Sequence, residues 1–145
     1  MSNEIEIVSL VDTWLQTVLS GDSTLSTAVS GRIIGDMGDL GTFATPYVQH
    51  VFQSTRDVTT VDGTIIDTDN LVVVKAVAQT GSWASLTTIA ARIHTLLHSP
   101  GVTYTLTGGA SLTCVRERAI KIIDEETGRQ YRHLGGQYRI RASRV

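Results

Sequence analysis

Apolar residues recur with the period of an α-helix in two stretches of the chain. The first stretch predicts an amphipathic helix over residues 4–19, ended by Gly21. The second predicts a helix that begins after the N-cap residue Ser82 and stops before Pro100. The apolar stripes comprise Ile7, Val8, Val11, Trp14, Leu15 and Val18 in the first helix, and Trp83, Leu86, Ile89, Ala90, Ile93, Leu96 and Leu97 in the second. A further short helical turn is expected around residues 24–29.

The other apolar positions follow the period of a β-strand. A near-continuous β-branched run over residues 71–78 is typical of a central strand buried on at least one face. Near the end of the chain Tyr138 and Ile140 alternate with Arg139 and Arg141, which predicts a half-buried strand. Strands are expected at residues 32–34, 47–56, 71–78, 102–106, 111–123 and 130–142, the last two joined by a hairpin loop at 124–128.

This order of elements predicts one α+β domain over residues 1–145. It consists of a mainly antiparallel β-sheet with two helices packed on one face, plus an extended C-terminal β-hairpin. Residues 31–45 and 57–69 are polar or glycine-rich, so both segments are expected to be mobile in the free protein. The predicted core includes Val8, Trp14, Leu15, Val72, Val74, Ile89, Ile93 and Ile140.

Composition narrows the class of protein. Hydrophobic residues make up 41% of the chain and charged residues 18%, as in a globular protein. No apolar run approaches the ~20 residues that span a bilayer, and Glu4 and Glu6 stand where a secretion signal needs basic residues. Neither a membrane location nor export is therefore expected. The single cysteine, Cys114, cannot form an internal disulfide and is expected to be a buried thiol.

Charge is distributed unevenly along the chain. Residues 1–72 contain ten acidic and two basic residues, whereas residues 73–145 contain four acidic and ten basic residues. Two readings stay open. In the first, the acidic and basic residues lie on ordinary solvated surfaces. In the second, the subunit has one acidic and one basic face, suited to pairing with copies of itself or to facing DNA.

Catalytic and metal-binding motifs are sparse. His94 and His98 lie four residues apart on the second helix, a spacing that can share a metal ion. The metalloprotease motif needs a glutamate directly after the first histidine, and Thr95 stands there instead. The glycine-rich segment at residues 31–41 lacks the Lys-Ser or Lys-Thr pair of a phosphate-binding loop. No catalytic residue, metal site or cofactor is predicted, and an enzyme using His94 and His98 is kept as the less favoured alternative.

Four arginines in the last two strands are the candidate functional residues. Arg116 and Arg118 are expected on one face of their strand, as are Arg139 and Arg141 on the returning strand. If the strands pair, four guanidinium groups can form one patch that binds phosphate or carboxylate groups. We expect these residues to face either a neighbouring subunit or DNA, without reading its sequence. The alternative is an ordinary solvent face, or salt bridges to Glu117 and to the acids of a neighbouring subunit.

The spaced pattern of the whole chain resembles the tail-terminator, or tail-completion, family of long-tailed bacteriophages. The stretches that carry the resemblance are Gly31-Arg32-Ile33, Pro46-Tyr47-Val48, Val72–Val77, Ile89–Ile93 with Leu96-Leu97, Val115–Ile123 and Gln137–Arg141, in that order and over most of the chain.

The resemblance implies a structural virion protein without catalytic activity or cofactor. Such a protein forms a ring, typically a hexamer, at the head–tail interface. The ring terminates the tail tube and joins it to the connector or stopper protein on the head side, and viral DNA passes through its channel. The resemblance also implies assembly in the bacterial cytoplasm and location in the tail or neck of the virion. Another neck protein, a connector adaptor or stopper, is the alternative within this class.

Overall fold

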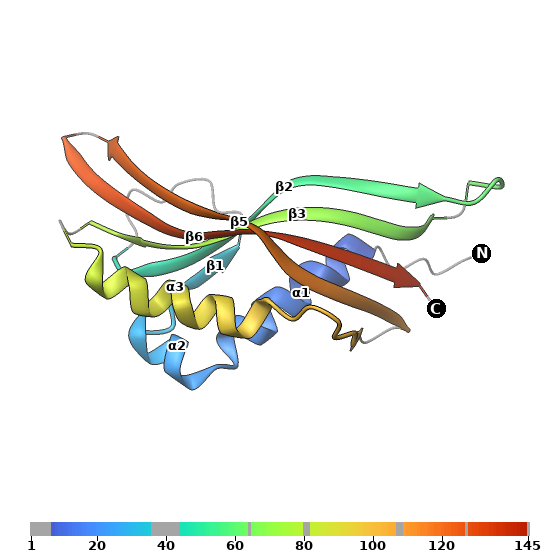
Figure 1. The fold of residues 1–145 in the computed structure, drawn as a ribbon, viewed down its shortest axis with the longest axis horizontal. Coiled ribbons are helices and arrows are strands. Elements are labelled where there is room, and N and C mark those ends of the chain that lie inside the picture. The colour runs from blue at the N-terminus through green and yellow to red at the C-terminus, as the bar shows by residue number, and fades with distance from the viewer. Residues whose placement is uncertain are drawn as a thin grey trace.

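We describe the protein from a computed structural model, which places residues 7–35, 44–63, 65–79, 82–106, 109–126 and 128–144. A mostly antiparallel sheet forms one layer, and three helices cover one of its faces (Figure 1). The α+β class predicted from the sequence is confirmed. The expected first helical turn at residues 4–6 and most of the glycine-rich segment lie outside the described residues.

The helices lie where apolar periodicity predicts them. They are α1 (Ile7–Ser20), α2 (Ser23–Ala28) and α3 (Ala84–Leu97). Asp22 is the N-cap of α2, and its carboxylate accepts a hydrogen bond from the Leu25 N–H at 2.9 Å. The expected turn at residues 24–29 is therefore a short helix. The N-cap of α3 is Trp83 rather than Ser82, although the Ser82 hydroxyl accepts a hydrogen bond from the Ala84 N–H. None of the helices in the described part of the chain is long and apolar enough to cross a membrane.

The sheet has six strands in the order β1-β2-β3-β6-β5-β4. The strands are β1 (Ile33–Gly35), β2 (Tyr47–Thr59), β3 (Ile65–Ala78), β4 (Tyr104–Leu106), β5 (Ala110–Glu126) and β6 (Arg129–Arg144). Among the strands of the described residues, only β1 and β2 pair in parallel. The strand predicted at 71–78 is central, between β2 and β6. The hairpins β2–β3 and β5–β6 extend towards opposite ends of the molecule (Figure 1).

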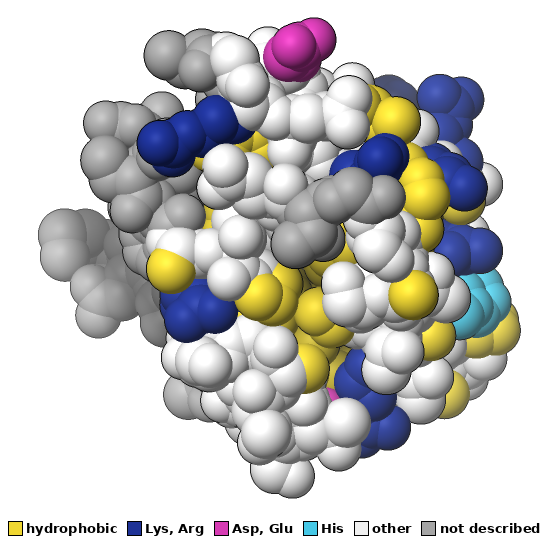
Figure 2. Space-filling view, turned by 90° about the vertical axis from the view of Figure 1, so that its left-hand side faces the viewer, with side chains coloured by type: hydrophobic (Ala, Val, Ile, Leu, Met, Phe, Trp, Pro, Cys, Tyr) yellow, Lys and Arg dark blue, Asp and Glu magenta, His cyan; other side chains and the backbone are white. Residues whose placement is uncertain are grey.

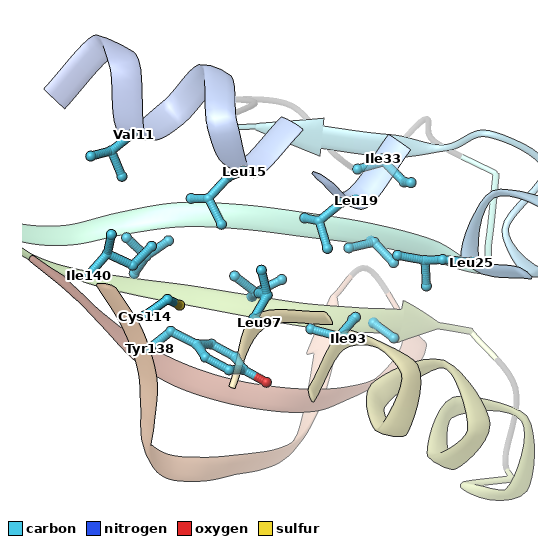
Figure 3. Packing of buried hydrophobic residues seen from close by; sticks show 14 of the residues in the cluster. Val11, Leu15, Leu19, Leu25, Ile33, Ile93, Leu97, Cys114, Tyr138 and Ile140 are labelled. Carbon is cyan, nitrogen blue, oxygen red and sulfur yellow. The ribbon is translucent and has the colours of Figure 1, made fainter. Parts of the chain in front are cut away.

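The core lies between the sheet and the helices (Figure 3). Six of the eight predicted core residues are fully or almost fully buried: Leu15, Val72, Val74, Ile89, Ile93 and Ile140. Trp14 is half-buried against this core and contacts Tyr104 in a tilted arrangement, with 5.3 Å between ring centroids. Val8 is only partly buried and lies outside the core cluster. The prediction for Val8 was wrong because the row spaced by four residues, from Ile7 to Leu19, faces the sheet.

Two predicted loops are strands instead. Residues 57–69 were expected to form a polar, mobile segment, yet β2 continues to Thr59 and β3 begins at Ile65. The hairpin loop expected at 124–128 is shorter too, because β5 continues to Glu126 and pairs with Arg129. The added part of β2 and residues 124–125 of β5 are exposed, whereas the added part of β3, residues 65–69, is half-buried or buried except at Ile66. Backbone pairing rather than a continuous apolar face defines these extensions, so the hydrophobic pattern does not reveal them.

Candidate interaction surface

The face of the sheet opposite the helices is the first candidate surface, because no described helix covers it (Figure 1). Side chains alternate along β6, so Tyr138, Ile140 and Ala142 point into the core while Arg139 and Arg141 point to this helix-free face. The alternation predicted from the sequence is confirmed here.

Arg139 is held by two carboxylates of its own subunit. Its Nη1 atom donates a hydrogen bond to Asp69 Oδ1 at 2.7 Å, and its Nε atom donates to Glu117 Oε1. The hydrogen bond from Arg139 lowers the pKa of Glu117 below its ordinary value. Arg141 is freer, since its side chain is 69% exposed and its Nε atom lies 3.9 Å from Asp69. The carboxylates that neutralise Arg139 thus belong to the same subunit.

Arg116 and Arg118 lie on opposite faces of the sheet, which corrects the expectation that they share one. A β-bulge separates them, since Arg116 pairs with Tyr138 and Arg118 pairs with Gln137. Arg116 therefore lies on the helix side, where a methyl group added to Gly136 would stand 2.6 Å from Arg116 Cδ. Arg118 lies on the helix-free face.

Arg118, Arg139 and Arg141 therefore share the helix-free face, and Arg116 does not. Of the two acids that accompany them, sequence reasoning named Glu117 as a possible ion-pair partner and missed Asp69. Asp69 lay in a segment read as a loop, and Glu117 turns to this face through the bulge. One sequence signal could have shown that β3 begins before residue 71. It is the apolar pair Ile65-Ile66, which precedes Asp67 and Asp69.

The histidine pair has no metal-chelating arrangement. The rings of His94 and His98 stack nearly parallel with 4.6 Å between centroids, and His98 Nδ1 accepts a hydrogen bond from the Arg116 N–H at 3.0 Å. Burial and the nearby charge of Arg116 lower the pKa of His94. Within the described ranges, no three His, Cys, Asp or Glu side chains are grouped to hold a metal ion. The pair is accounted for by packing between α3 and β5.

A second set of polar groups lies on the helix-free face, towards the β5–β6 turn. Burial lowers the pKa of Lys75, and burial together with the Lys75 charge lowers the pKa of His133 to about 4. Both residues border a small apolar cluster that contains Tyr47, Val77 and Tyr131. These groups are packed rather than presented to solvent.

The end of the molecule where α3 begins carries several basic side chains and few acidic ones (Figure 2). Here the Lys121 Nζ atom and the Arg132 guanidinium lie over the Trp83 ring, at 4.8 Å and 5.1 Å from its centroid. Both cations are attracted to the electron-rich face of the indole ring, a cation–π contact. This contact fixes the β5–β6 hairpin against the first turn of α3.

The lone thiol belongs to the core. Cys114 is fully buried, and burial raises its pKa to about 12, so it stays protonated at neutral pH. The prediction of a buried thiol is confirmed.

Comparison with known proteins identifies the fold. No family model matches the sequence, and no curated protein matches it either. Among solved structures, the chain is similar to one in a structure described as the virion of a native gene transfer agent particle. The two align with a TM-score of 0.70 and 17% sequence identity, over 95% of this chain and 99% of that chain. At this identity the likeness shows a shared fold over almost the full length of both chains.

Proposed function

We propose that the protein is a structural subunit of a phage-like virion, and specifically a tail terminator that forms a ring, a hexamer, at the head–tail interface. The observation that carries the proposal is the fold shared, over almost the full length of both chains, with a chain from a gene transfer agent virion. The terminator-like sequence pattern agrees with it.

In this ring the helices lie on the outside and the helix-free face of the sheet lines the channel. That face carries Arg118 and Arg141, whose side chains are exposed, and Arg139, which is bound to Asp69 and Glu117. Because cations and carboxylates are interspersed, the net attraction for DNA is weak. Sparse contacts of this kind suit a duplex that slides through without being read.

The tail tube protein, the head-side connector and the viral DNA are the partners in this proposal. The first test is electron microscopy of the concentrated protein, in which the proposal expects rings with an open centre. Addition of tail tubes from the same virus should place one ring at the head-proximal end of each tube. Rings that attach only to isolated heads would instead favour a connector adaptor or stopper.

Charge reversal tests the role of the helix-free face. The double variant Arg118→Glu/Arg141→Glu suits this test better than a change at Arg139. Arg139 forms an ion pair with Asp69 that joins β6 to β3, so its replacement would also disturb the fold of the subunit. Thr88→Glu, at an exposed position of α3 on the other side of the sheet, is the control. We expect the double variant to form rings while virions built with it lose DNA retention or delivery. Loss of rings would show that this face binds a neighbouring subunit instead.

A further inference from the structure

The long strands β2 and β5 lie next to the edges of the sheet, and each is flanked on its outer side by a strand of three residues. β1 pairs with β2 over Ile33–Gly35 alone, and β4 pairs with β5 over Tyr104–Leu106 alone. No other described strand lies beside the rest of β2 or β5. Long strand edges with unpaired backbone groups are templates for association with another chain, and proteins normally shorten or cover them.

The direction of the backbone groups follows from two hydrogen bonds. The Val48 N–H donates outwards to the Arg32 carbonyl, and the Arg116 N–H donates outwards to His98. Backbone groups alternate sides along a strand. The register is regular along β6 and along β3 from Asp67 to Ala78, so these strands carry the alternation past the bulges within β2 and β5. The N–H groups that point away from the sheet are therefore those of Thr55 and Asp57 on β2, and of Ala119, Lys121 and Ile123 on β5.

We propose that the free edge of β5 in one subunit pairs with the free edge of β2 in the next copy of this chain, so that the sheet continues around the ring. This inference rests on the proposed ring function. The strands β2, β3, β6 and β5 alternate in direction, so a neighbouring β2 beside β5 continues the antiparallel order.

The geometry of the two hairpins fits a closed assembly. The free parts of β2 and β5 lie at opposite ends of the long axis (Figure 1), so pairing them displaces each subunit along the strand direction. A sheet closed on itself requires such a stagger between strands. Closure also removes both free edges, whereas a monomer leaves them exposed to solvent.

Side chains beside the two edges are complementary. Asp57 and Lys121 both project to the helix side of the sheet, so a register that places them opposite each other sets a carboxylate beside an ammonium group. Two β5 edges paired about Lys121 would instead set two ammonium groups together. Apolar side chains that are partly exposed in the monomer, Val58 at 39% and Ile123 at 51%, would be covered by the unlike pairing.

Proline substitution on the outward side of β5 tests the pairing. Proline has no N–H but is tolerated on an edge strand where that N–H faces solvent, so Ile123→Pro should keep the β5–β6 hairpin intact. Ile123→Ala is the matched control, because it removes the same apolar side chain and keeps the N–H. Native mass spectrometry measures assembly, and circular dichroism confirms that each variant is folded.

We expect Ile123→Ala to form rings and Ile123→Pro to be folded but at least about tenfold weaker in assembly. Should Ile123→Pro fail to fold, Asp57→Pro against Asp57→Ala asks the same question on β2. The reversals Asp57→Lys and Lys121→Asp should each weaken assembly and, combined, restore it. Folded Ile123→Pro or Asp57→Pro that assembles like its alanine control would overturn the edge pairing and leave the ring proposal standing. A parent chain that remains monomeric at the highest soluble concentration would overturn both.

Discussion

The orientation of α3 can be tested at Ile93, which is fully buried between this helix and the sheet (Figure 3). Truncation of a buried isoleucine to alanine costs about 2–5 kcal/mol, through lost apolar burial and the cavity left behind. In a chain of 145 residues each kcal/mol lowers the melting temperature by about 3–4 °C. Ile93→Ala should therefore melt roughly 10 °C below the parent protein. Ile93→Asp should lose more, because a buried carboxylate without a partner is added to the cavity.

Thermal unfolding followed by far-ultraviolet circular dichroism measures the effect. Thr88→Ala is the control, since Thr88 is an exposed residue of the same helix and its truncation should change stability by less than about 0.5 kcal/mol. If Ile93→Asp melts within about two degrees of the parent, α3 does not bury the face that holds Ile93. The packing described between the helices and the sheet would then be wrong.

Three further changes have expected outcomes. Asn70 is fully buried and hydrogen-bonded to Thr55, to Thr68 and to the Ile140 carbonyl, so Asn70→Ala should lower the free energy of unfolding by about 2 kcal/mol in denaturant titrations. The hydrogen bond from Arg92 to Asp22 lowers the pKa of the Asp22 carboxyl from 3.8 to about 2. This carboxylate therefore contributes stability above pH ~4 that is lost as the pH falls towards 2, and Asp22→Asn should flatten that part of the stability profile. The pKa of His133 is about 4 in the folded protein, against an ordinary value of 6.5. Between pH 6.5 and pH 4 the unfolded chain binds more protons than the folded one, so the free energy of unfolding falls as the pH is lowered through this range. His133→Asn should remove this dependence of stability on pH.

The elements with buried apolar stripes were predictable from the sequence. Helices α1 and α3 each bury one row of side chains, and that row appears directly as a period in the sequence. The central part of β3 is buried on both faces and appears as a near-continuous apolar run. The extensions of the β2–β3 and β5–β6 hairpins were not predictable in this way. Most of their residues are polar, no apolar periodicity marks them, and only the partner strand shows that they are paired.

The candidate surface was predicted in part. Alternation along β6 placed Arg139 and Arg141 on the helix-free face correctly. The same reasoning misplaced Arg116, because one bulged residue, Glu117, reverses the alternation on β5 and no local sequence signal marks it. Ion pairs such as Arg139–Asp69 join residues 70 positions apart, so charge counts along the chain could not anticipate them.

The central claim, a ring of identical subunits, is tested most directly by native mass spectrometry of the purified chain over a wide range of concentration. Head-to-tail contacts between unlike surfaces close at one stoichiometry or continue as filaments. We expect a monomer at low concentration to convert to a single closed oligomer, a hexamer, without a populated dimer. A stable dimer as the end state would show that identical patches join two subunits, and it would contradict the ring.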